Sequence, residues 1–131
     1  MDRGPSYRHG LPDELWERAQ AEARSAMIKR ASRGRTMTYT DLCNEIEAIC
    51  FDPHDLRLPH FLGQISTEED EQGRGMLTAV VVHKHDGQPG KGFYALARSL
   101  GRAVIDEERT WIEELAKLRD YYSPPRAGGA A

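Results

Sequence analysis

Residues 75–93, with the sequence GMLTAVVVHKHDGQPGKGF, constrain the fold more than any other part of the chain. Residues 77–82 form a short apolar run that is rich in β-branched side chains and is followed by breakers, a pattern that predicts a buried strand. The residues after this run combine glycines with four basic or titratable side chains, His83, Lys84, His85 and Lys91. Such a composition predicts a short charged turn. A buried strand that leads into this turn, with helical patterns on both sides, predicts a small domain that mixes helices and strands.

The length and composition fit one globular domain. A chain of 131 residues can bury a core without help from a disulfide or a metal. No apolar run approaches the ~20 residues that span a bilayer, so we expect no membrane insertion. The first ten residues lack the apolar middle of a secretory signal, which predicts a cytoplasmic location in which the two cysteines stay reduced. We expect a flexible N-terminus over residues 1–10, a single domain over residues 11–122 and a disordered tail over residues 123–131, where prolines and small residues cannot pack.

Two helices are predicted in the first half of the domain. The first covers residues 12–32 and carries its apolar side chains on one stripe. A short strand is expected over residues 36–38. Thr38 is then a good N-cap for a second helix, with Asp41 three positions on as a capping box, and this helix is expected to run to about Cys50.

Helices also dominate the second half. A third helix is expected to start within residues 56–59 and repeats apolar residues at helical spacing. After the buried strand and the charged turn, a second short strand is expected near residues 92–94 if one forms at all. A short helix closed by Gly101 and a last helix opened by Asp106 complete the chain. The predicted fold class is therefore α+β and mostly helical, with the last helix packed on the long first one.

The order of elements from Thr38 to Phe93 resembles the winged helix-turn-helix family, in which the charged turn is the wing. A more particular resemblance is to the DNA-binding half of the alkylguanine alkyltransferases and alkyltransferase-like proteins. The segment TYTDLCNEI is similar to their tYgelA segment, with Tyr39 at the tyrosine, and HFLGQI is similar to their RAVG segment. Their strand carries a reactive PCHRV motif, but here the cysteine, histidine and arginine are replaced by Ala79, Val80 and Val81. The resemblance thus implies winged-helix geometry without a nucleophile for alkyl transfer.

The winged-helix resemblance implies that the third helix enters the major groove of DNA and that the wing lies against phosphates. The helix residues that could reach base edges or phosphates are Arg57, His60, Gln64 and Thr67. The wing candidates, which lie beside glycines that allow close approach to a phosphate, are Lys84, His85 and Lys91. A basic cluster before the second helix could make a further phosphate contact through Arg33 and Arg35. Each group also has a plainer interpretation, as a solvated helix face, a polar turn or a helix end stabilised by cations.

The charge pattern favours some of these candidate DNA contacts over others. The formal net charge is −3, but residues 36–73 carry nine acidic groups against one basic group, whereas residues 74–105 carry five basic groups against one acidic group. Carboxylates on the third helix would repel DNA phosphates. We therefore expect the wing, more than the third helix, to supply any attraction for DNA.

The predicted function is that of a small, non-catalytic winged-helix protein that binds double-stranded DNA, with a homodimer through the outer helices as a further expectation. The alternative is a winged-helix adaptor that binds another protein and no DNA. A metal-dependent enzyme is a third interpretation, based only on the alternation of His83 and His85 at a strand end, where no third ligand is evident. No cofactor is expected.

Overall fold

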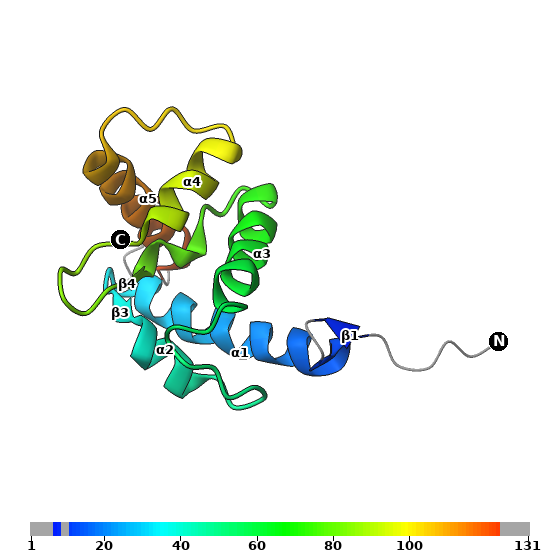
Figure 1. Cartoon of the computed structure of the whole chain (residues 1–131). Coiled ribbons are helices and arrows are strands. Elements are labelled where there is room, and N and C mark those ends of the chain that lie inside the picture. The colour runs from blue at the N-terminus through cyan, green and yellow to red at the C-terminus, as the bar shows by residue number, and fades with distance from the viewer. Residues whose placement is uncertain (1–6, 9–10, 124–131) are drawn as a thin grey trace, which may run out of the picture.

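Helices form most of the protein, as Figure 1 shows for the computed structural model, which describes residues 7–8 and 11–123. The helices are α1 (Asp13–Ser32), α2 (Tyr39–Glu45), α3 (Leu58–Glu71), α4 (Lys91–Ser99) and α5 (Glu107–Tyr122), with a 3₁₀ turn, η1, at Leu77–Val80. The strands each contain two residues: β1 (Tyr7–Arg8), β2 (Leu11–Pro12), β3 (Met37–Thr38) and β4 (Val81–Val82). The predicted α+β, mostly helical class is confirmed. Of the segments predicted to be flexible or disordered, residues 1–6, 9–10 and 124–131 lie outside the described residues.

Helix α1 lies at the centre of the packing. Its buried side includes Trp16, Met27 and four alanines, whose small side chains allow neighbouring elements to approach closely. Helices α2, α3 and α5 and the turn η1 all pack against it. The predicted long first helix and the packing of the last helix on it are confirmed. No helix in the described ranges is long and apolar enough to cross a membrane.

The apolar run at residues 77–82 is buried as expected, but most of it is not a strand. Leu77–Val80 forms the turn η1, and only Val81–Val82 forms a strand. Strand β4 pairs in parallel with β3, with Met37 opposite Val81 and Thr38 opposite Val82. A short buried apolar run suits a helical turn and a strand equally well, so its pattern could not distinguish them. The indole of Trp111 on α5 donates a hydrogen bond to the Ala79 carbonyl at 2.8 Å and so satisfies one backbone group of the turn.

The second strand predicted at residues 92–94 is wrong, because α4 begins at Lys91. The loop at residues 83–90 is closed on itself by two backbone hydrogen bonds, from His83 N to Gln88 O and from Gly87 N to His83 O, both 2.9 Å. Phe93, Tyr94 and Ala97 are buried, and their spacing matches one face of a helix. These side chains are therefore buried on one face of a helix, and the loop does not continue into a second strand.

The predicted capping box of the second helix is confirmed, whereas its predicted end at Cys50 is wrong. The Thr38 hydroxyl accepts from Asp41 N and the Asp41 carboxylate accepts from Thr38 N, both at 3.1 Å. Helix α2 ends at Glu45, because the carboxylate of Glu22 on α1 accepts hydrogen bonds from the next backbone amides, Glu47 N at 3.1 Å and Ala48 N at 2.9 Å. Those amides no longer need helical partners.

Two buried carboxylates connect the helices. Glu69 on α3 is 1% exposed and pairs with Arg24 of α1 and with Arg74, and its carboxylate also accepts from the Tyr122 hydroxyl of α5 at 2.6 Å. The second carboxylate, Glu114 of α5, is also buried and accepts hydrogen bonds from Met76 N and from the guanidinium of Arg102. These contacts hold α3 and α5 in place around α1.

Candidate functional site

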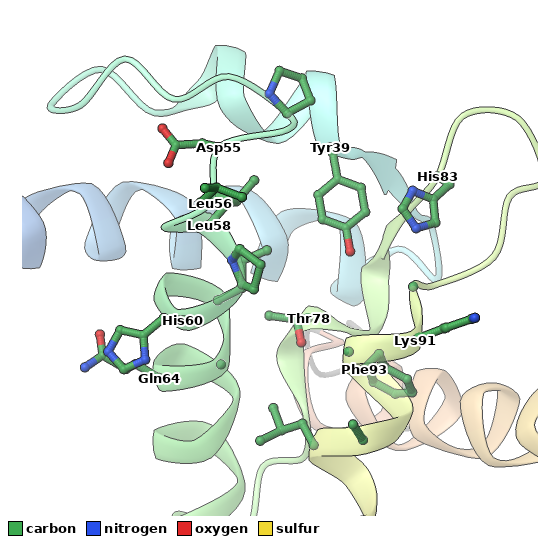
Figure 2. A pocket seen from close by; sticks show the side chains of 18 of the residues that line it. Tyr39, Asp55, Leu56, Leu58, His60, Gln64, Thr78, His83, Lys91 and Phe93 are labelled. Atoms are coloured by element: carbon green, nitrogen blue, oxygen red, sulfur yellow. The ribbon is translucent and has the colours of Figure 1, made fainter. Parts of the chain in front are cut away.

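A large groove opens between α3 and α4, below the N-terminus of α2 (Figure 2). Its volume is about 1540 Å³. This exceeds the roughly 300–1,000 Å³ of typical small-molecule sites, so the groove has room for a segment of a polymer. Its apolar lining includes Leu56, Leu58, Pro59, Leu62 and Phe93, and Thr78 lines it at the centre.

One side of the groove is formed by His83, Lys84, His85 and Lys91, which we call the basic wall. Three of these residues come from the loop after β4, and Lys91 is the first residue of α4. The side chains of Lys84 and Lys91 form no ion pair with any residue in the described part of the chain, whereas His85 lies 3.3 Å from the Asp86 carboxylate. The described residues therefore leave the charge of both lysines unneutralised at the edge of the groove, where the Lys91 side chain extends away from the groove interior (Figure 2).

Three aromatic rings follow one another along this wall, and we call them the ring stack: Tyr39, His83 and His85. The centroid of the His83 ring is 5.0 Å from that of Tyr39 and 5.5 Å from that of His85, with an angle of 32° between planes in each pair. Gly90 leaves room for this arrangement, since a Cβ atom there would lie 2.9 Å from His83 Nε2 and 3.6 Å from the Tyr39 hydroxyl. Burial raises the pKa of Tyr39, so its hydroxyl stays protonated and can donate a hydrogen bond in the groove.

The opposite side of the groove is acidic, and its carboxylates come from α3 and the turn before it. We call Asp55, Glu68 and Glu71 the acidic wall. Glu68 pairs with Arg24 at 2.7 Å, and Asp55 forms two hydrogen bonds with the guanidinium of Arg57, at 2.9 and 2.7 Å. Because Arg24 and Arg57 pair with two of these carboxylates, Glu71 is the member of the acidic wall that forms no ion pair with the described residues. The groove thus carries positive charge beside α4 and a smaller negative charge beside α3.

The predicted site residues of the third helix have structural partners. Arg57 does not line the groove: Asp55 holds its guanidinium, whose carbon lies 5.2 Å from the centroid of the Phe51 ring. The bond to Asp55 raises the Arg57 pKa. Gln64 lines the groove, but its carbonyl accepts hydrogen bonds from the Trp16 indole at 2.8 Å and from Gln20 at 2.9 Å. His60 also lines the groove and lies beside the Trp16 ring.

Some of the other predicted site residues line the groove and some do not. Tyr39, Lys84, His85 and Lys91 are brought together in the groove. Arg33 and Arg35 are exposed after α1 and do not line it. The sequence placed His83 in the charged turn, as a surface histidine or a metal ligand, and did not indicate its position between two rings. The parallel pairing of β3 with β4 brings these three rings together, and no spacing in the sequence indicates that pairing. The only signal for the ring stack was that its three residues follow the ends of predicted strands.

The three residues that the sequence comparison aligned with the reactive alkyltransferase motif do not line the groove. Ala79, Val80 and Val81 are fully buried in η1 and β4. Of the two cysteines, Cys43 is buried, Cys50 is exposed, and neither belongs to the groove lining. No cluster of three or more metal-ligating side chains occurs among the described residues. The main functional groups of the described groove are its charged side chains and its aromatic rings.

Comparison with known proteins gives no match: no protein-family model, no curated protein and no solved structure is significantly similar to the chain.

Proposed function

We propose that this protein is a non-catalytic nucleic-acid-binding protein and that the groove between α3 and α4 is its binding site. One observation carries the proposal: the ring stack lines the same groove as two lysines whose charge the described residues leave unneutralised. Nucleic acids offer both complementary groups, since phosphates attract ammonium groups and base faces stack on aromatic rings.

The proposal gives each part of the basic wall a role. Lys84 and Lys91 contact phosphates, and the glycines on either side of Lys91 allow the backbone of α4 to approach the same phosphates closely. Tyr39, His83 and His85 contact bases or sugars. Arg57, held by Asp55, contributes by keeping the turn before α3 in place.

The proposal includes a winged-helix origin for the segment from α2 to α4. It is supported by the order of α2, α3, β4 and a charged loop, and by the position of Tyr39 at the start of α2. In this variant the loop leads into a helix instead of a second strand, and β4 pairs with β3 in parallel. The wing of the family is then represented by residues 83–90 alone.

Fluorescence anisotropy with labelled oligonucleotides of mixed sequence tests the function. Two phosphate contacts predict that affinity falls about tenfold between 50 and 200 mM salt. The Lys84→Glu/Lys91→Glu double variant is expected to lose binding and most of this salt dependence.

The matched control is Arg109→Glu/Lys117→Glu, which makes the same change in net charge on the exposed surface of α5, outside the groove. It is expected to reduce affinity only slightly. If no oligonucleotide binds at low salt, or if both double variants lose affinity equally, the proposed site is wrong.

A protein-binding adaptor is the second candidate function, and Leu56 is the observation that favours it. This side chain is 95% exposed at the edge of the groove, next to apolar lining residues. An exposed leucine beside an apolar groove is a frequent feature of protein interfaces. If the groove binds a protein partner, Leu56→Ser is expected to weaken that complex. Light scattering at several concentrations would test the homodimer.

A further inference from the structure

The division of charge across the groove bears on which nucleic acid can enter it. A duplex carries phosphates along both of its strands, with one negative charge per ~1.7 Å of helix axis. A duplex that places one strand on Lys84 and Lys91 brings the phosphates of its other strand toward α3, where the exposed Glu71 carboxylate lines the groove. A single strand carries its phosphates along one edge and its bases along the other. It can therefore place the phosphates on the basic wall and keep them away from the acidic wall.

The ring stack also bears on whether the groove binds a duplex or a single strand. In a duplex, each base is covered above and below by its neighbours, so its face is not available to a protein ring. Unpaired bases expose their faces and stack on aromatic side chains. His85 is suited to such a contact, since 78% of its side chain is exposed while its ring continues the line that starts at Tyr39.

The acidic wall also has a role with unpaired bases. Carboxylates accept hydrogen bonds and cannot donate them, so they match the amino and imino groups on the pairing edges of bases. In a duplex those edges are occupied by the complementary strand. With phosphates on the basic wall, the bases of a single strand point across the groove toward α3, where Glu71 is exposed.

We infer that the groove binds single-stranded nucleic acid, with its phosphates on Lys84 and Lys91 and its bases between the ring stack and α3. This inference rests on the proposed function and replaces the double-stranded DNA expected from the sequence pattern. A groove of about 1540 Å³ is large enough for more than one nucleotide, which suits a strand that passes through it.

Anisotropy with three labelled 12-nucleotide probes of one mixed sequence tests the inference: single-stranded DNA, single-stranded RNA and blunt duplex DNA. At least one single strand is expected to bind tenfold or more tightly than the duplex. Equal or tighter binding of the duplex would overturn the inference and leave the proposed function intact. Absence of binding by all three probes at low salt would overturn both. The stronger of the two single strands identifies DNA or RNA as the ligand.

Two variants separate stacking from charge. Tyr39→Leu and His85→Ala are each expected to weaken single-strand binding about five- to tenfold, with a much smaller effect on the duplex. Tyr39→Phe, which keeps the ring and removes only the hydroxyl, is the matched comparison and should lose less affinity for the single strand than Tyr39→Leu. His85 is largely exposed, so His85→Ala is informative even if Tyr39→Leu disturbs folding, which melting curves would reveal. An equal loss for single strand and duplex in His85→Ala would contradict the inference.

Discussion

The neighbouring residues Glu68 and Glu69 offer a sharp test of how the fold is held together. Both pair with Arg24, but Glu68 has a side chain that is 59% exposed, whereas that of Glu69 is 1% exposed. Glu69 also pairs with Arg74 and accepts a hydrogen bond from the Tyr122 hydroxyl at 2.6 Å. Replacing the buried carboxylate therefore removes the shared partner of three groups on different elements.

The expected loss follows from these contacts. Breaking a buried ion pair from one side destabilises a protein by about 3–5 kcal/mol. The side chains of Arg24 and Arg74 are each 31% exposed, so water can partly replace the lost carboxylate, and we expect Glu69→Gln to lower the free energy of unfolding by about 2–3 kcal/mol. Glu68→Gln removes an exposed pair, which is worth about 0–1 kcal/mol.

Urea denaturation followed by circular dichroism measures both variants. Glu69→Gln should shift the midpoint to lower urea with an unchanged slope, and its melting temperature should fall by roughly 10 °C. Glu68→Gln should remain near the parent protein. If the two variants are equally stable, the assignment of Glu69 as a central structural contact is refuted.

Three further predictions concern other parts of the structure. Burial, together with the charges of nearby acidic groups, raises the pKa of Cys43 from 9.0 to about 11, so its thiolate fraction at pH 8 is reduced about a hundredfold. Ellman's reagent should therefore react quickly with Cys50 and slowly with Cys43. Equal reaction rates for the two thiols would contradict this prediction. Gly90→Ala should weaken single-strand binding roughly two- to tenfold by displacing His83, with little change in melting temperature, and unchanged affinity would refute the role given to this glycine. Burial and the hydrogen bond to Glu69 raise the pKa of Tyr122. The Tyr122 hydroxyl therefore ionises at about pH 10 in the unfolded chain and only at higher pH in the folded protein. Because of this difference, the free energy of unfolding should fall as pH rises above about 10. Tyr122→Phe should show a smaller difference between urea midpoints at pH 9 and pH 11, and an undiminished difference would argue against this residue as the cause.

Local signals in the sequence predicted most helices because they act over a few residues. Thr38 and Asp41 form the capping box that their spacing predicts, and Asp106 caps α5 by accepting a hydrogen bond from Arg109 N. The stripe of small and apolar residues on α1 is buried as its periodicity requires. The errors occur where a distant partner decides the conformation, as at the end of α2, where Glu22 of α1 supplies the acceptor for two backbone amides.

The candidate site was predictable only in part. Lys84, His85 and Lys91 were identified because glycines and basic residues occur together in a short segment, and Tyr39 was identified by a family resemblance. Arg57 has the right chemistry for a phosphate contact, but Asp55 occupies its guanidinium, which no spacing rule predicts.

The sequence by itself determined the buried apolar run and the charged turn within residues 75–93, the helical character of the domain and the separation of acidic and basic segments, since composition and periodicity are local properties of the chain. Only the tertiary structure decided that these segments face one another. The parallel pairing of β3 with β4 places Tyr39 beside His83, and the packing of α3 and α4 encloses the groove between an acidic and a basic wall. These contacts join residues that are far apart in the sequence, and their geometry depends on the burial of the whole core, which no short stretch of sequence encodes.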